Sequence, residues 1–171
     1  MDIIVPNVGA LADSQGADED YWRAGFEIEI LATVRMVETT LAFLEKSESG
    51  AIVAISSAAA LESFGGVRLY NSVKAALINY VSNLANNLAQ KGIRANTVSP
   101  GTINFKIGVW HDRERESPEI FKMAMGRNPL GRMGTPEEVA NAVAFLASPA
   151  AGFITSANLV VDGGITQRLQ C

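Results

Sequence analysis

The chain has 171 residues, and 48% of them are hydrophobic, which is enough for one domain with a substantial core. Its formal net charge is -4, with acidic and basic residues interspersed, so the composition argues against a nucleic-acid-binding protein. No apolar run reaches membrane-spanning length, and the only cysteine, Cys171, excludes an internal disulfide framework and suits a cytoplasmic location.

The first third of the chain predicts two strands separated by helix. Residues 2–5 form a short apolar run, which is typical of a buried strand. A polar stretch over residues 13–20 predicts a loop that leads into a helix near Tyr21. Apolar residues at helical spacing then predict a second helix that ends at about Lys46. Residues 51–57 follow as a buried strand that ends in two serines.

A long helix is predicted to begin at about Tyr70 and to end at about Lys91. Gly92 comes directly after it, as is common at the carboxyl end of a helix. Residues 94–98 then form another apolar run, which predicts a third strand. A Pro-Gly pair closes this strand at Pro100.

The last third begins with a mixed, charged segment, residues 104–128, which predicts a loop with short helices. Thr135 is a good helix N-cap, Pro136 suits the first helical position, and Glu138 completes a capping box, so a helix is expected from there to about residue 146. Asn158–Val161 is the last predicted strand. The alternation of strands and helices indicates an α/β domain with a parallel sheet.

Tyr70 and Lys74 are the strongest functional signal, because they lie four residues apart and share one face of the predicted helix. Ser57 precedes them at the end of a strand. A free phenol has a pKa of about 10, and a nearby ammonium lowers it. A serine hydroxyl beside that phenol can hold a substrate oxygen. The three residue types therefore predict proton transfer between an alcohol and a carbonyl.

Several further motifs occur in the order found in the short-chain dehydrogenase/reductase family, and the chain resembles a member of it from Asp2 to Gly164. The family ends its central strand in Asn-Asn-Ala-Gly and also has an Asn-x-(Val/Ile)-x-Pro-Gly-x-Ile segment. The corresponding stretches here are Pro6-Asn7-Val8-Gly9, Asn96-Thr97-Val98-Ser99-Pro100-Gly101-Thr102-Ile103, Leu130-Gly131-Arg132-Met133-Gly134-Thr135-Pro136-Glu137-Glu138 and Val161-Asp162-Gly163-Gly164.

The glycine-rich turn Thr-Gly-x-x-x-Gly-x-Gly, which in the family receives the dinucleotide pyrophosphate, has no counterpart in this sequence. The chain therefore resembles the second half of a family member. We expect residues 1–171 to form a single truncated Rossmann-like domain, with a partial doubly wound parallel sheet and a substrate lid at about residues 104–128. The strand at residues 2–5 would then form an exposed edge.

The resemblance implies a role for each matching residue. Tyr70 would be the general acid/base, Lys74 would lower its pKa and hold the nicotinamide ribose hydroxyls, and Ser57 would orient the substrate oxygen. Further contacts to NAD or NADP are implied for Asn7, Gly9, Pro100, Gly101 and Ile103. The choice between the two cofactors is not encoded, because residues for the adenine half are absent. No metal site is predicted.

Two positions depart from the family pattern. Glu29 stands where the family has an asparagine that anchors a water next to the lysine. A carboxylate there would hold a water and pair with Lys74, which would raise the pKa of Tyr70; the alternative is that Glu29 faces solvent. Phe105 stands where the family often has a threonine that reaches the cofactor, and an aromatic ring there would wall the pocket.

The sequence leaves two functional hypotheses. The first is an oxidoreductase that transfers hydride between NAD(P)(H) and a small secondary alcohol or ketone. The second is a non-catalytic, truncated fragment that acts as an oligomerising module. Under either hypothesis we expect a homo-oligomer, a dimer or a tetramer, because the family forms its oligomer contacts through helices that this chain retains. A membrane partner is not expected.

Overall fold

A computed structural model describes residues 1–9, 18–63 and 66–167 of the chain. Its sheet has four parallel strands in the order β1-β2-β3-β4. The strands are β1 (Ile3–Ile4), β2 (Ala51–Ile55), β3 (Arg94–Pro100) and β4 (Asn158–Val161). The predicted α/β fold with a parallel sheet is thus confirmed. β1 is shorter than the sequence suggested, and β3 extends two residues further.

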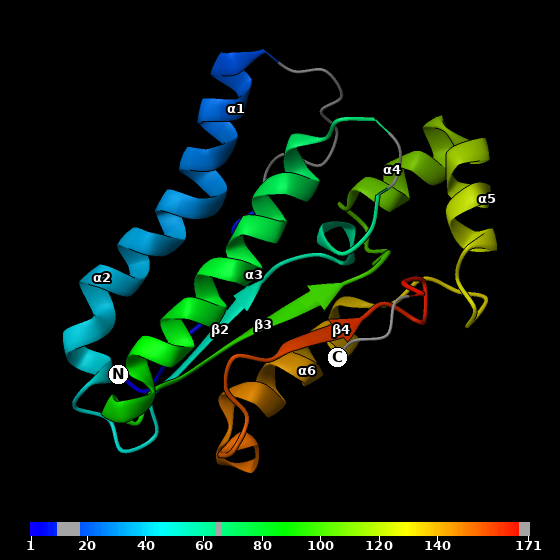
Figure 1. Cartoon of the computed structure of the whole chain (residues 1–171). Coiled ribbons are helices and arrows are strands. Elements are labelled where there is room, and N and C mark those ends of the chain that lie inside the picture. Colours follow the sequence, from blue (N-terminus) through cyan, green and yellow to red (C-terminus); the bar gives the residue numbers. More distant parts are fainter. Residues whose placement is uncertain (10–17, 64–65, 168–171) are drawn as a thin grey trace.

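Helices cover both faces of this sheet, as in a doubly wound domain (Figure 1). On one face α3 (Leu69–Leu88) packs beside a continuous helical run made of α1 (Glu19–Phe26), a π-helix (Glu27–Leu31) and α2 (Ala32–Leu44). On the other face lies α6 (Pro136–Ala147). The two helices predicted before residue 46 are therefore one run, joined by a π-helical turn.

The core has two parts because successive strand residues point to opposite faces of the sheet. Ile52 and Ala54 of β2 pack on the α3 side together with Leu77. Val53, between them in sequence, packs on the α6 side against Leu146. All of these side chains are buried. A strand that is covered on both faces consists of consecutive apolar residues, and the sequence of β2 has this pattern.

Two predicted helix ends are confirmed. α3 continues into a 3-10 turn (Ala89–Lys91) and stops at Gly92, whose φ of 72° is left-handed and suits glycine. Thr135 caps α6 in a complete capping box with Glu138. The charged segment before α6 contains two short helices, α4 (Val109–Glu116) and α5 (Pro118–Gly126), as expected for residues 104–128. That this segment is a lid over the substrate stays a prediction. The remaining short 3-10 turns are Ala58–Ala60 and Pro149–Ala151.

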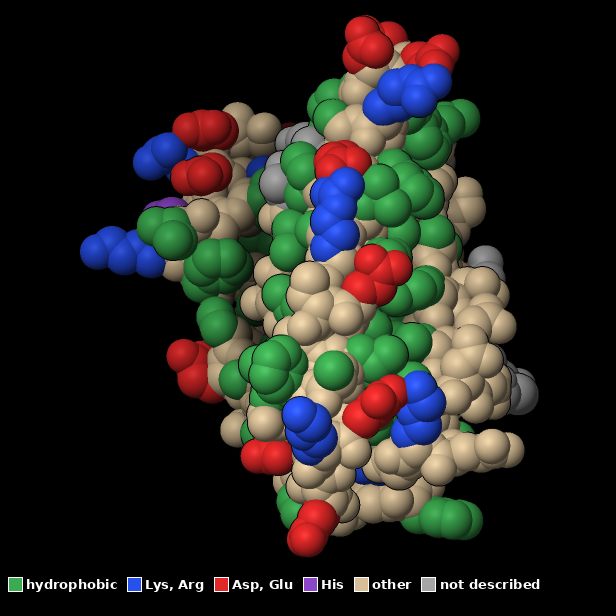
Figure 2. Space-filling view, turned by 90° about the vertical axis from the view of Figure 1, so that its left-hand side faces the viewer, with side chains coloured by type: hydrophobic (Ala, Val, Ile, Leu, Met, Phe, Trp, Pro, Cys, Tyr) green, Lys and Arg blue, Asp and Glu red, His purple; other side chains and the backbone are tan. Residues whose placement is uncertain are grey.

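β1 forms one edge of the described sheet, as expected, and side chains around it are exposed, among them Ile3 and Val5. The outer face of the α1–α2 run also carries hydrophobic side chains between charged ones (Figure 2). Phe26, Met36 and Phe43 are the exposed large apolar residues of this run. In the described part of the chain, no helix is both long enough and apolar enough to cross a bilayer. The predicted loop at residues 13–20 lies outside the described residues as far as residue 17, as does Cys171; its last two residues, Glu19 and Asp20, already belong to α1, which Asp18 caps.

Candidate active site

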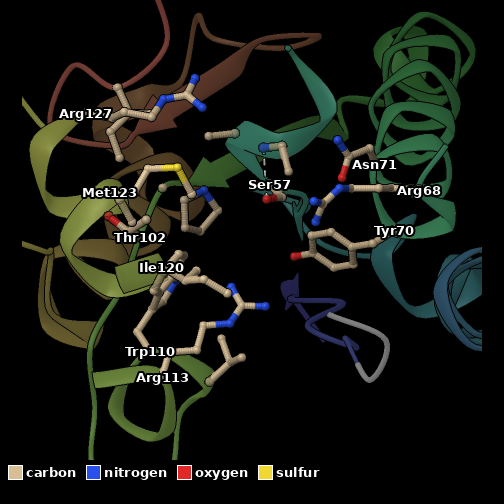
Figure 3. A pocket seen from close by; sticks show the side chains of 17 residues that line it. Ser57, Arg68, Tyr70, Asn71, Thr102, Trp110, Arg113, Ile120, Met123 and Arg127 are labelled. Carbon is tan, nitrogen blue, oxygen red and sulfur yellow. Dashed lines mark hydrogen bonds between the residues drawn. The ribbon is translucent and has the colours of Figure 1, made fainter. Parts of the chain in front are cut away.

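A cavity of about 280 Å³ lies where β2 and β3 end. The carboxyl ends of parallel strands are the usual position for a ligand site in an open α/β sheet. Its wall brings together residues from β2, the start of α3 and the α4–α5 segment (Figure 3). They include Ser57, Arg68, Tyr70, Thr102, Trp110 and Arg113.

Ser57 and Tyr70 lie near each other on one side of this cavity (Figure 3). Ser57 comes directly after β2 and caps the 3-10 turn, where its Oγ accepts a hydrogen bond from the Ala59 amide at 3.1 Å. Tyr70 lines the same cavity, and its interaction with Ser57 lowers the pKa of the phenol. The neighbouring Ser56 Oγ donates to the Lys74 carbonyl at 2.9 Å. The end of β2 is therefore tied to the first turns of α3, which fixes Ser57 relative to Tyr70.

Lys74 and Glu29 form a buried ion pair beneath Tyr70. The Lys74 Nζ lies 2.7 Å from the Glu29 Oε2, and the two side chains are 2% and 0% exposed. Lys74 also donates to the carbonyls of Val8 and Ile55, at 2.9 and 3.0 Å. Glu29 lies in the π-helical turn, a feature that often occurs at functional sites. The alternative in which Glu29 faces solvent is therefore wrong.

The surroundings of Tyr70 raise the pKa of its phenol above the ordinary value of 10. Burial is the main cause and the negative charge of Glu29 adds to it, whereas the hydrogen bond with Ser57 lowers the pKa. The Lys74 Nζ lies 5.7 Å from the Tyr70 ring centroid, and Glu29 lies directly beside it. Because the carboxylate offsets the ammonium, the pair does not act on Tyr70 as an isolated positive charge.

The other expected cofactor residues fall into two groups. Pro100 and Gly101 line the cavity. Asn7, Gly9 and Ile103 do not: Asn7 is exposed, Gly9 lies next to the Lys74–Glu29 pair, and Ile103 forms an isolated bridge with Gly134.

Phe105 is also absent from the cavity wall, and its ring instead packs against Gly108, where a Cβ would lie 2.6 Å from the ring. The expectation that Phe105 walls this cavity is not met, because the chain turns there toward α4.

Sequence reasoning missed five polar residues of the wall: Arg68, Asn71, Thr102, Arg113 and Arg127. Arg68 and Asn71 flank Tyr70, and Thr102 follows the Pro-Gly pair, so their nearness to known site residues was an available signal. Arg113 had no such signal. It belongs to a stretch of alternating charges that is typical of a solvated helix face, whereas in the structure its guanidinium stacks on Trp110 at 4.8 Å from the ring centroid and lines the cavity.

A family model described as "Enoyl-(Acyl carrier protein) reductase" matches residues 1–166. The chain belongs to the short-chain dehydrogenase/reductase family. Its relatives in this family include isoepoxydon dehydrogenase patN of Penicillium expansum, which is 35% identical over 96% of this chain and 63% of its own length. Dehydrogenase/reductase SDR family member 4 of Oryctolagus cuniculus is also 35% identical, over 99% of this chain and 65% of its own length.

Solved structures of short-chain family members superpose closely on this chain. An oxidoreductase from Burkholderia thailandensis has 37% identity and a TM-score of 0.87, covering 96% of this chain and 64% of its own. An NADPH-bound short-chain oxidoreductase from Pseudomonas aeruginosa PAO1, described as containing an atypical catalytic center, has 27% identity and a TM-score of 0.89, covering 98% and 66%. The chain spans 63% of the length of the first of the curated relatives above.

Proposed function

We propose that this chain carries the catalytic half of an oxidoreductase that interconverts a secondary alcohol and a ketone with NAD(P)(H). The observation that supports it best is that Ser57 and Tyr70 line one cavity, with the Lys74 ammonium 5.7 Å from the centroid of the Tyr70 ring. In this proposal Tyr70 gives a proton to the carbonyl oxygen, or takes it from the alcohol, while Ser57 holds that oxygen in place.

The cavity wall fits the nicotinamide half of the cofactor. Thr102 Oγ1 and Asn104 Oδ1 are buried and have no hydrogen-bond partner within the described part of the chain, although they follow the Pro100-Gly101 turn at the site. Buried polar atoms usually have partners, so Thr102, which is the one of the two that lines the cavity, would suit a polar ligand such as a carboxamide. A bound nicotinamide would supply or accept the hydride. The sequence offers no glycine-rich turn for the other half of the dinucleotide.

The contacts of Lys74 support a different role for this residue from the one that the resemblance implied. An ammonium has three N–H donors, and three oxygens surround it here: the Val8 and Ile55 carbonyls and the Glu29 carboxylate. A contact from Lys74 to ribose hydroxyls would have to replace one of them. We therefore propose that Lys74 mainly positions the backbone after β1 and, together with Glu29, sets the pKa of Tyr70.

The test is turnover of a panel of ketones by the purified chain with NADPH or NADH, followed by cofactor absorbance. We expect Tyr70→Phe to lower the rate by about 10²- to 10⁴-fold, because it removes the general acid. Tyr80→Phe is a matched control, since it makes the same change on the same helix at a residue that packs in the core. Equal rates in wild type and Tyr70→Phe would refute the role of Tyr70.

The pH dependence tests the role of Glu29. Because the pKa of Tyr70 is raised, the phenolate needed for alcohol oxidation forms only at high pH, so the rate should increase as pH rises. Glu29→Gln removes one of the causes that raise this pKa and should shift the profile toward lower pH. A purely structural role would change the rate without moving the profile.

A second candidate function is a non-catalytic oligomerising module. It is favoured by the exposed Phe26, Met36 and Phe43 on the α1–α2 run and by the enclosed ammonium of Lys74. In this hypothesis a homodimer or homotetramer assembles through the α1–α2 and α3 faces. Absence of Tyr70-dependent turnover, together with a stable oligomer in light scattering, would favour it. The cytoplasmic location suggested by the single cysteine stays a prediction.

A further inference from the structure

Two parts of the cavity wall come from segments that lie outside the sheet. Arg127 is the C-cap residue of α5 and lies across the cavity from Tyr70 (Figure 3). Ile165 belongs to the C-terminal segment, defined here as residues 162–167, and its side chain is 7% exposed although it lies in no helix or strand. A segment without regular secondary structure keeps its position only through specific contacts. The shape of this side of the cavity therefore depends on what holds the C-terminal segment.

Glu62 contacts both of these wall segments. Its Oε1 accepts a hydrogen bond from the Gln167 amide at 2.7 Å, and its Oε2 lies 3.7 Å from the Arg127 Nη2. The Glu62 side chain is 16% exposed, and a mostly buried carboxylate needs such partners to offset its lost solvation. Glu62 is not among the residues that line the cavity. It therefore acts on the wall from behind, through Gln167 and Arg127.

The C-terminal segment is held at two points, and Ile165 lies between them. At the first, Asp162 accepts hydrogen bonds from the amide and the hydroxyl of Thr166, at 2.8 and 2.7 Å. At the second, the hydrogen bond from Gln167 to Glu62 joins residues that are far apart in sequence. The Asp162 contacts are internal to the segment, so they fix its local turn. The Glu62 contact is the one that ties Gln167 to another part of the fold.

We propose that Glu62 is a positioning residue for substrate binding, because it fixes the segments that carry Ile165 and Arg127. This inference rests on the proposed function, since it assigns the cavity to the ketone or alcohol. Ser57 and Tyr70 belong to other elements, so proton transfer continues once the substrate is bound. Loss of the Glu62 carboxylate therefore weakens binding and leaves the chemical step nearly unchanged.

Steady-state kinetics of Glu62→Ala tests this role with the ketone that the wild type reduces best. We expect KM to rise about tenfold and kcat to stay within about threefold, because a charge-assisted hydrogen bond and an ion pair are lost. Glu62→Gln keeps an oxygen that can accept from the Gln167 amide but loses the charge. Its KM should lie between those of the wild type and Glu62→Ala.

Glu45→Ala is the matched control for the kinetics. Glu45 also joins distant parts of the chain through an ion pair, with Lys91, but neither residue lines the cavity. Its KM should equal that of the wild type. An equal rise of KM in Glu45→Ala would contradict the assignment, and so would a lower kcat without a change of KM in Glu62→Ala, which marks a general structural effect.

Amide hydrogen exchange followed by NMR tests the Glu62 contact without any turnover. In Glu62→Ala the Gln167 amide should exchange at least about tenfold faster. The Thr166 amide is the internal control, because Asp162 holds it, and its rate should stay within about twofold. An unchanged Gln167 rate in Glu62→Ala would overturn the proposal.

The two experiments separate this inference from the proposed function. Faster Gln167 exchange in Glu62→Ala, in a chain without Tyr70-dependent turnover, would refute the proposed function and leave Glu62 as the residue that holds the C-terminal segment. Tyr70-dependent turnover with an unchanged KM in Glu62→Ala would refute this inference alone.

Discussion

The two walls of the cavity differ in how deeply their side chains are buried and in how firmly hydrogen bonds hold them. On the sheet side, Ser56 and Lys74 are tied by hydrogen bonds to neighbouring elements, and Lys74 and Glu29 are almost fully buried. On the lid side, Ile120 and Met123 of α5 are 44% and 63% exposed although they line the same cavity. A fixed wall can hold a proton-transfer geometry, and an exposed helical segment can vary without disturbing the fold. Under the proposed function, the residues that carry catalysis all lie on the sheet-side wall.

The largest expected effect on stability comes from disrupting the buried charge pair of the sheet-side wall. Glu29→Ala should lower the free energy of unfolding by about 3–5 kcal/mol, because it leaves the Lys74 ammonium buried without its carboxylate. Urea unfolding followed by circular dichroism measures this. Glu19→Ala is the surface control, since the Glu19–Arg23 pair is exposed and should contribute at most about 1 kcal/mol. Similar values for both variants would contradict the contrast between buried and exposed pairs.

A second pair of variants compares packing on the two sides. Leu77→Ala, in the core beneath α3, should cost about 2–5 kcal/mol because it opens a cavity at a residue that is 2% exposed. Ile120→Ala removes a side chain of the same size from the lid and should change stability by about 0.5 kcal/mol or less. Thermal unfolding of both variants gives the comparison. A large loss in Ile120→Ala would mean that the lid belongs to the cooperative core.

The smallest effect concerns the junction between the lid and α6. Thr135→Ala removes the N-cap of α6 and should cost about 1 kcal/mol. The cap also involves Glu138, whose carboxylate is held by Arg132 and by the Thr135 amide; these contacts lower its pKa to about 2.

The sign of the pH effect follows from that lowered pKa. The stabilisation by Glu138 is fully present above its unfolded value of 4.5 and is lost as pH falls toward 2. Comparing unfolding at pH 7 and pH 3 in wild type and Glu138→Gln measures it. If the stability against unfolding falls equally between pH 7 and pH 3 in both proteins, Glu138 is not the source of the pH effect.

Local patterns explain why much of the fold was predictable. The continuous apolar run of β2, the glycine at position 92 and the capping box at Thr135 each act within a few residues of chain, and each has the predicted structure. The spacing of Tyr70 and Lys74 is equally local, because one helical turn brings both to the same side. The π-helical turn at Glu27–Leu31 was not predicted, since periodicity over such a short stretch does not separate it from an α-helix.

The sequence by itself determined the family, the parallel α/β architecture, the absence of a glycine-rich turn and the candidate residues Ser57, Tyr70 and Lys74. Only the tertiary structure decided that Glu29 points inward to Lys74, that Phe105 turns away and that arginines from α3 and α4 meet at one cavity. The physical reason is the separation of the interacting residues along the chain. Caps, turns and periodicity depend only on residues that are close in sequence. Contacts between distant residues such as Glu29 and Lys74 depend on how whole elements pack.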